Sequence, residues 1–266
     1  MKSELSLVRL IRDYPFSSLP DSLSKNPREQ RIPTVVTQTW EENLFGRTHK
    51  SHLKKFRAAN QDLSFVIYDA QQRDDYMLER WGKHKIHEIY SRARFGPMKV
   101  DIFRYCLIWE QGGYYFDISK GIRGSITELH APLADEFLSI ERNFVPEGML
   151  APSSPLLLRP RHLFIQWGFG FAPKHPILGN LIEQICDRHT LYLDREFPKP
   201  KDAILELTGP IAFTRSVWNY LETSSKGVFQ LDFDFDGKGI YGMKGSAARF
   251  HKYPSYSDAR HQRIFK

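Results

Sequence analysis

The 266-residue sequence predicts an α/β fold in which a mainly parallel central sheet is flanked by helices. Two observations lead to this prediction. Short apolar or aromatic runs typical of strands alternate with longer segments of helical periodicity, and a glycine pair separates one such helix from the strand that follows it. Alternation of this kind favours parallel pairing, because each helix carries the chain back across the sheet. We expect a single domain over residues 1–266.

The first predicted elements lie between residues 1 and 81. An amphipathic helix is expected over residues 1–12, and a connector rich in Ser and Pro completes an N-terminal segment of residues 1–31. Residues 32–40 predict a first strand and residues 51–60 a helix, whereas residues 65–68 predict a second strand and residues 74–81 another helix. The order strand, helix, strand, helix indicates that the first two strands lie parallel.

Residues 96–121 are the most informative segment. Pro97 suits the first turn of a helix, and apolar residues recur at helical spacing as far as residue 107. Gly112 and Gly113 can take the left-handed conformations that end a helix, and the aromatic residues 114–116 are typical of a strand. Asp117 then stands at the carboxyl end of that strand, the edge at which open α/β sheets bind ligands.

Asp101 and Arg104 are spaced to share one face of this helix. Taken alone, such a pair is more often a surface ion pair worth about 0.3–0.5 kcal/mol than part of a site. Its position just before the glycine turn and Asp117 favours a functional role.

Beyond residue 121 the pattern is looser. Residues 146–160 predict a loop, residues 177–189 a helix, and residues 211–221 a helix that follows a loop beginning at Thr208. Residues 232–236 alternate Asp with Phe and predict a half-buried strand. This run also begins like a calcium-binding loop, but Met243 stands where a bidentate Glu is required, so calcium is not predicted there.

Composition narrows the class of protein. Cys106 and Cys186, the two cysteines, lie in apolar helical patterns, which predicts buried, reduced thiols in a cytoplasmic protein. No apolar run reaches the ~18–20 residues of a membrane span, and the first twelve residues lack the apolar core of a signal peptide. The net charge of +7 favours an acidic partner. Nucleic acid is not predicted as that partner, because the basic residues are dispersed and no reading motif is present.

The central segment resembles the sugar transferases that carry a DxD motif, a glycosyltransferase family 32-like group with fungal outer-chain mannosyltransferases and bacterial capsule and lipopolysaccharide transferases. Their pattern is Asp-x-x-Arg-Tyr on a helix, then Gly-Gly, a strand and Asp-x-Asp. Here residues 101–105, 112–113 and 117–119 stand in those places. Weaker matches follow the family's order at residues 32–40, 60–69, 171–176, 207–210 and 251–256, so the resemblance spans residues 32–256.

The resemblance implies a Rossmann-like nucleotide-diphospho-sugar transferase fold of the GT-A type. It also implies transfer of a sugar, with retention of anomeric configuration, from a nucleotide sugar to a hydroxyl of a glycan, a polysaccharide or a lipid-linked saccharide. Residues 32–130 would be the donor-nucleotide half, and residues 131–266 the acceptor side and closing segment. The alternative is a non-catalytic relative that binds nucleotide sugar or glycan. The expected location is the cytoplasm, with peripheral association at the inner face of a membrane, and the oligomeric state is left open.

The resemblance further implies the site residues. Asp117 would bind the ribose or the sugar and any metal ion, whereas Asp101 and Arg104 would hold sugar hydroxyls. Gln38 and Trp40 would meet the base. The full set implied to bind the donor is Gln38, Trp40, Gly112, Gly113, Ser119, Lys120, His251, Ser255 and Tyr256, of which the last three would close over the diphosphate.

The chain departs from the family at Ser119, which stands in place of the second aspartate of the motif. A serine hydroxyl is a weaker ligand than a carboxylate for Mn²⁺ or Mg²⁺, so the sequence leaves the need for a divalent metal open. Lys120 follows directly, and its positive charge could lie against the diphosphate in partial replacement of the metal. A solvated loop lysine is the equally weighted alternative for this residue.

Overall fold

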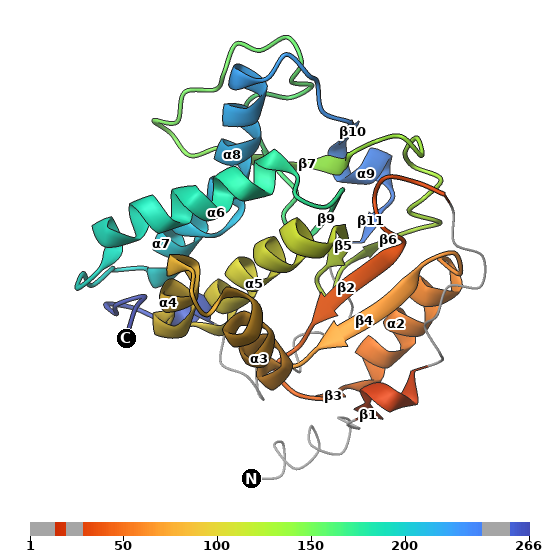
Figure 1. The fold of residues 1–266 in the computed structure, drawn as a ribbon, viewed down its shortest axis with the longest axis horizontal. Helices are drawn as coiled ribbons and strands as arrows, with labels where there is room; N and C mark the ends of the chain where they lie inside the picture. The colour runs from red at the N-terminus through yellow and green to blue at the C-terminus, as the bar shows by residue number, and fades with distance from the viewer. Residues whose placement is uncertain (1–13, 20–28, 241–255) are drawn as a thin grey trace.

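The computed structural model describes residues 14–19, 29–240 and 256–266. Within these residues the centre of the molecule is a seven-stranded sheet with the strand order β10-β7-β9-β5-β2-β4, and β8 pairs with β7 beside this path (Figure 1). The strands are β2 (Val35–Thr39), β4 (Ser64–Tyr68), β5 (Gly113–Phe116), β7 (Glu136–Phe144), β8 (His162–Phe164), β9 (Gly168–Phe171) and β10 (Gln230–Asp232).

The sheet is mixed, which corrects the expectation of a mainly parallel one. β2 runs parallel to β4 and β5, and β10 runs parallel to β7. β9 is antiparallel to both β5 and β7, and β8 is antiparallel to β7. β8 and β9 thus pair with successive parts of β7, and residues 165–167 interrupt the run between them. An antiparallel pairing needs no crossover helix, so the alternation of strands and helices did not reveal it.

Helices cover both faces of the sheet (Figure 1). Tyr115 belongs to a core cluster shared with the helices of one face, whereas Tyr114 and Phe116 belong to a cluster that includes Phe56 of α2. Because successive side chains of a strand point to opposite faces, α2 covers the other side. The helices are α2 (Arg47–Ala58) on that side and α3 (Ala70–Trp81), α4 (Lys85–Arg92), α5 (Gly96–Gln111), α6 (Pro176–Arg188), α7 (Pro200–Leu207) and α8 (Pro210–Thr223) on the first.

Short elements complete the described chain. β1 (Tyr14–Pro15) pairs with β3 (Leu44–Phe45), and β6 (Gly121–Ile122) pairs with β11 (Gly239–Ile240). The 3-10 helices are η1 (Phe16–Ser18), η2 (His189–Tyr192) and η3 (Tyr256–Asp258). None of the helices that the structure describes combines the length and the apolar character needed to cross a membrane. The helix expected over residues 1–12 lies outside the described residues, and the single-domain prediction remains a prediction.

The glycine pair behaves as predicted. Gly112 and Gly113 have φ angles of 69° and 97°, which only glycine adopts readily. A Cβ on Gly112 would lie 2.8 Å from the ring carbons of Pro33 and Pro173, so the junction of α5 and β5 also needs the missing side chain for space. The pair therefore fixes how α5 meets the sheet.

The prediction of a strand over residues 232–236 was wrong. β10 ends at Asp232, and the next residues form α9 (Phe233–Gly237), a tight turn in which Asp234, Phe235 and Asp236 have φ angles of 54–56°. Asp236 Oδ1 accepts a hydrogen bond from the backbone of Asp232 at 2.9 Å, and the Phe235 backbone donates to Ser139 Oγ at 2.7 Å. Aspartate side chains bond to nearby backbone in this way, and that local competition ends the strand.

The predicted burial of the thiols is confirmed, because Cys106 and Cys186 are both buried and form no disulfide. Burial raises the pKa of Cys186 to about 12.

Candidate functional site

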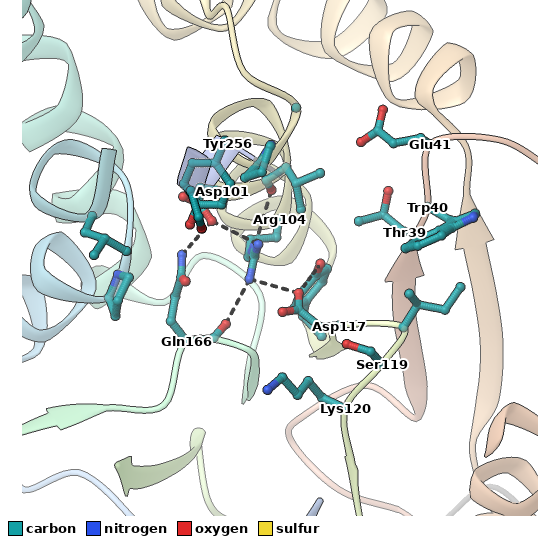
Figure 2. Close-up of a pocket in the computed structure, with 18 of the residues that line it drawn as sticks. Thr39, Trp40, Glu41, Asp101, Arg104, Asp117, Ser119, Lys120, Gln166 and Tyr256 are labelled. Atoms are coloured by element: carbon teal, nitrogen blue, oxygen red, sulfur yellow. Dashed lines mark hydrogen bonds and ion pairs between the residues drawn. The ribbon is translucent and has the colours of Figure 1, made fainter. Parts of the chain in front are cut away.

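A cleft of about 840 Å³ opens at the carboxyl ends of β2 and β5 (Figure 2). Its walls come from the end of β2, the first turns of α5, the loop after β5, Gln166 between β8 and β9, the start of α8, and η3. This is the sheet edge at which the sequence predicts ligand binding.

Arg104 is the centre of the cleft floor, with 6% of its side chain exposed. Its Nη2 lies 2.9 Å from Asp101 Oδ1, and its Nη1 lies 3.3 Å from Asp117 Oδ1 (Figure 2). Nη1 also donates to the backbone oxygen of Gln166 at 3.1 Å, and the guanidinium lies 4.4 Å from the centroid of the Tyr115 ring. One cation therefore holds two carboxylates that come from different elements.

Asp101 is held by two further hydrogen bonds. Gln166 Nε2 donates to Asp101 Oδ1 at 2.8 Å, and Thr208 Oγ1 donates to Asp101 Oδ2 at 3.0 Å. Burial raises the pKa of Asp101 to about 6, although Arg104 and these two hydrogen bonds favour its ionised form. Burial thus opposes the ionised form of Asp101, which its three partners favour.

Asp117 links the cleft floor to the opening. Its backbone N–H donates to the Trp167 carbonyl at 2.8 Å, and its own carbonyl accepts from the Lys120 N–H at 2.8 Å, which closes a turn. The Tyr115 hydroxyl donates to Asp117 Oδ1 at 3.0 Å. Because 34% of the Asp117 side chain is exposed, this carboxylate is oriented by its neighbours and still faces the cleft.

Ser119 and Lys120 line the cleft next to Asp117 (Figure 2). The Lys120 carbonyl accepts a hydrogen bond at 3.0 Å from Nε2 of His52, and burial lowers the pKa of that histidine. The Lys120 ammonium lies 5.5 Å from the centroid of the Trp167 ring. A hydroxyl and a positive charge are thus available to an anionic ligand at this end of the site.

Trp40 and Tyr256, two of the residues implied to bind the donor, both line the cleft. The Trp40 Nε1 donates to the Leu44 carbonyl at 2.9 Å, and its ring packs against His49 with centroids 5.1 Å apart. Tyr256 enters from η3, where its ring lies 6.5 Å from that of Phe95. These contacts hold aromatic side chains in the cleft wall, where planar ligand groups can stack on them.

Three predicted donor-binding residues do not reach the cleft. Gln38 is completely buried within β2 and is absent from the lining. Gly112 and Gly113 lie at the amino end of β5, opposite the end that carries Asp117, so the structure gives them the turn described above instead of a donor contact. His251 and Ser255 lie outside the described residues.

Two cleft residues, Gln166 and Glu41, and one buried residue behind the cleft, Thr208, were missed or given no role in the sequence. Gln166 lies between two short strands, where no periodicity singles it out. Thr208 was noticed within a weak motif at residues 207–210, but its contact with Asp101 depends on the packing of α7 against the start of α8. Glu41, which follows Trp40, also faces the cleft.

The chain is similar to known sugar transferases over the segment that forms the cleft floor. Residues 46–136 match the family described as the glycosyltransferase sugar-binding region containing a DXD motif. The chain is 25% identical over 202 residues to the initiation-specific alpha-1,6-mannosyltransferase of Schizosaccharomyces pombe, covering 73% of this chain and 50% of that protein. It is 21% identical over 119 residues to inositol phosphoceramide mannosyltransferase 2 of the same organism, covering 44% of this chain and 34% of that protein. The chain thus spans at most about half the length of these relatives.

A solved structure supports the fold. The PaToxG glycosyltransferase superposes with a TM-score of 0.50 at 15% identity, covering 73% of this chain and 71% of that one. The predicted sugar-transferase fold is confirmed, with the sheet mixed as described. Asp101, Arg104 and Asp117 lie within the segment that matches the sugar-binding region of the DXD glycosyltransferases, which confirms the resemblance predicted from the sequence.

Proposed function

We propose that this chain is a glycosyltransferase that moves a hexose from a nucleoside diphosphate to a hydroxyl acceptor. The observation that carries the proposal is Arg104, which holds Asp101 and Asp117 together at the floor of the cleft. Carboxylates accept hydrogen bonds and a guanidinium donates them, so the three groups together match the hydroxyls of a sugar. The cleft volume of about 840 Å³ lies within the range of small-molecule sites.

Different residues of the cleft bind different parts of the donor. Asp101 and Arg104 hold sugar hydroxyls, and Asp117 binds the ribose or the sugar. Ser119 and Lys120 lie along the diphosphate. Trp40 lies against the nucleoside, at the end of the cleft formed by β2.

The proposed reaction is a displacement at the anomeric carbon. The bond from that carbon to the donor phosphate oxygen breaks, and its electron pair leaves with the diphosphate. The acceptor oxygen bonds to the same carbon, and its proton passes to the departing phosphate oxygen. The family resemblance favours retention, in which the acceptor approaches the face that the diphosphate leaves. Fixed positive charge beside the leaving group, here from Lys120, stabilises the charge that develops there.

The donor set of the loop after β5 fits a divalent metal ion, which transferases of the DXD type usually bind. Asp117 and Ser119 offer oxygen ligands, and Mg²⁺ is commonly held by one or two carboxylates together with substrate phosphates. Among the described residues, no group of three His, Cys, Asp or Glu side chains forms a metal site by itself. A bound ion would neutralise charge on the diphosphate.

The names of the relatives support a proposal for the donor sugar. They also favour a catalytic protein over one that only binds its ligand. Both relatives described above are named as mannosyltransferases, so we propose mannose as the sugar. The alternative, a non-catalytic protein that binds nucleotide sugar or glycan, is less favoured because these relatives are transferases. One relative is named for inositol phosphoceramide, and for this chain we propose a glycan or lipid-linked saccharide as acceptor. A cytoplasmic location, with peripheral association at a membrane, stays a prediction.

The test is release of nucleoside diphosphate by the purified chain. A panel of nucleotide sugars, including mannose and glucose donors, is incubated with and without an oligosaccharide acceptor and with Mn²⁺ or EDTA. We expect one donor to be cleaved by the wild type and spared by the Asp117→Ala variant. A donor that raises the melting temperature without being cleaved would support the binding-only alternative. No binding and no cleavage of any donor would contradict both.

A further inference from the structure

Glu41 stands on the cleft wall directly after Trp40 and has no part in the function proposed above (Figure 2). Its side chain is 40% exposed. Both carboxylate oxygens, Oε1 and Oε2, lie 3.1 Å from Nη2 of Arg73. Glu41 is therefore a carboxylate at the cleft surface whose position is fixed from behind.

Arg73 is an interior residue of α3, with 2% of its side chain exposed. Its second terminal nitrogen, Nη1, donates to the Thr39 hydroxyl and, at 2.7 Å, to the Trp40 carbonyl. Burial of a cation is costly unless it is paired and hydrogen-bonded, and the terminal nitrogens of Arg73 have their partners at Thr39, Trp40 and Glu41. Arg73 thus ties Glu41 to the backbone that carries Trp40.

The start of α5 leaves space for the carboxylate. A Cβ built on Gly96 would lie 3.1 Å from Glu41 Oε1, which is tighter than ordinary contact. Gly96 is also the first residue of α5, and the amino end of a helix favours a nearby negative charge. The Glu41 carboxylate therefore lies beside both Arg73 and the amino end of α5.

An ionised carboxylate only accepts hydrogen bonds, and it has about four lone-pair positions. Arg73 approaches the two oxygens from the interior, so acceptor positions face the cleft. A phosphate group is excluded as their partner, because it is also a negatively charged acceptor. The ligand group must instead present hydrogen-bond donors, and two adjacent donors match two carboxylate oxygens best.

We infer that Glu41 recognises the nucleoside of the donor by accepting hydrogen bonds from two adjacent donors. The inference rests on the proposed function. The sugar end of the cleft is already formed by Asp101, Arg104 and Asp117, whereas Glu41 adjoins the aromatic ring on which a base can stack. Two parts of a nucleoside carry such a donor pair: the 2′ and 3′ hydroxyls of ribose, and the N1–H and N2–H edge of guanine.

The experiment measures the affinity of nucleoside diphosphates by calorimetry, without any turnover. Guanosine diphosphate is compared with inosine diphosphate, which lacks the N2 amino group, and with 2′-deoxyguanosine diphosphate, which lacks one ribose hydroxyl. The wild type is expected to bind one of the two analogues about 10- to 100-fold more weakly than guanosine diphosphate, the effect of one hydrogen bond to a charged group. Glu41→Gln is expected to bring that ratio close to one.

Two further variants make the comparison specific. Glu42→Gln makes the same chemical change at the neighbouring exposed residue, which does not line the cleft, and it is expected to keep the wild-type ratio. Gly96→Ala leaves the carboxylate in the chain but crowds it, and it is expected to lower the ratio as Glu41→Gln does. Gly96→Ala also serves if Glu41→Gln leaves Arg73 unpaired and does not fold.

The outcomes separate this inference from the proposed function. A penalty for the inosine nucleotide assigns Glu41 to the guanine edge, and a penalty for the deoxynucleotide assigns it to ribose. Equal weakening of all three nucleotides in Glu41→Gln, or an unchanged ratio, would overturn the inference and leave Glu41 as a counter-charge for Arg73. Failure of the wild type to bind any nucleoside diphosphate, uridine diphosphate included, would instead contradict the proposed function.

Discussion

The floor and the rim of the cleft hold their charged groups in different ways. On the floor, Asp101 and Arg104 are 8% and 6% exposed, and Asp101 has partners on α5, on the segment before β9 and at the end of α7. On the rim, the Glu41 side chain is 40% exposed and forms an ion pair with Arg73. The charged side chains of the floor thus pair with one another in a buried network, whereas Glu41 on the rim pairs with an arginine behind it and is partly exposed to solvent.

This difference predicts different consequences for function. Charges on the floor act in a water-poor environment, where electrostatic interactions are stronger than at the surface. We expect changes on the floor to lower kcat and changes on the rim to alter donor affinity and selectivity. Substitutions at the floor should therefore have larger effects on turnover than substitutions at the rim.

Asp117→Ala should have the largest effect. Asp117 is the carboxylate shared by the floor and the opening, so its loss removes a ligand contact and one partner of Arg104. We expect kcat/KM to fall by about 10³-fold, a magnitude typical of lost charge stabilisation at a reacting centre. The melting temperature should change little, because the side chain is 34% exposed. Near-normal turnover of the folded variant would show that the site is elsewhere.

Asp101→Ala and Arg104→Ala should each lower kcat/KM by about 10²-fold, and the double variant should lose less than the sum. The two side chains lie 2.9 Å apart, and residues that act on one ligand are not additive. Arg104→Ala also leaves the buried Asp101 without its counter-charge, at a cost to stability of about 3–5 kcal/mol, which the double change relieves. In Asp101→Ala, Arg104 keeps Asp117 as its ion-pair partner. A double-mutant cycle in kcat/KM and in unfolding free energy tests this, and strictly additive losses would show independent roles.

The pH dependence should follow Asp101. Its folded pKa of about 6 lies above the ordinary value of 3.8, so the carboxylate is protonated as pH falls through about 6, and kcat/KM should fall with it. Stability runs in the opposite direction, because a raised folded pKa gives a contribution that is complete below about 4 and is lost as pH rises through 6. Profiles of kcat/KM and of unfolding free energy against pH check both signs.

Removal of a hydrogen bond to the ionised form of Asp101 should move the acid limb of the kcat/KM profile to higher pH. Thr208→Val removes the bond to Asp101 Oδ2, and we expect a shift of about one pH unit. The matched control is Thr214→Val, also a fully buried threonine, whose hydroxyl accepts from the Phe164 backbone at 2.9 Å and does not line the cleft. An equal shift in both variants would mean that the limb reports general destabilisation.

Changes at Ser119 and Lys120 should have the smallest effect on the fold and a selective effect on metal use. Ser119→Asp adds a carboxylate ligand, so the Mn²⁺ concentration that gives half-maximal activity should fall by about 10-fold. If the wild type is indifferent to EDTA, Lys120→Ala should lower activity severely, because the lysine then supplies the charge beside the diphosphate. Wild-type activity that needs only micromolar metal and ignores Lys120 would contradict both versions.

Local sequence patterns predicted the parts of the fold that depend on local contacts. The helix at residues 96–111, the glycine turn and the strand before Asp117 follow from spacing and backbone preference alone. The helix expected at residues 51–60 begins at Arg47, and α4 and α7 were not predicted, because each has only eight residues and too few turns for a clear period. The antiparallel pairing of β9 with β5 and β7 was not predicted, because it depends on contacts between strands that are distant in the sequence.

The site divides in the same way. Asp101, Arg104 and Asp117 lie close in sequence, so the spacing of one motif was enough to predict that they share a site. Gln166 contacts Arg104 from 62 residues away. Its irregular segment is positioned by distant contacts, from Ile165 to Ser139 of β7 and from Asp117 to Trp167, which no local pattern reveals. Gly112 and Gly113 were wrongly grouped with the donor. They lie only a few residues before Asp117 in the sequence, but β5 separates them and places the glycines at the opposite end of the strand.

We propose above all that Arg104, Asp101 and Asp117 form the sugar-binding floor of this cleft. The most direct measurement is a crystal structure of the chain with an intact or non-hydrolysable nucleotide sugar. We expect sugar hydroxyls within hydrogen-bond distance of Asp101 and Arg104, with the nucleoside at the end of the cleft formed by Trp40 and Glu41. A nucleotide sugar bound in the reverse orientation, or outside this cleft, would contradict it.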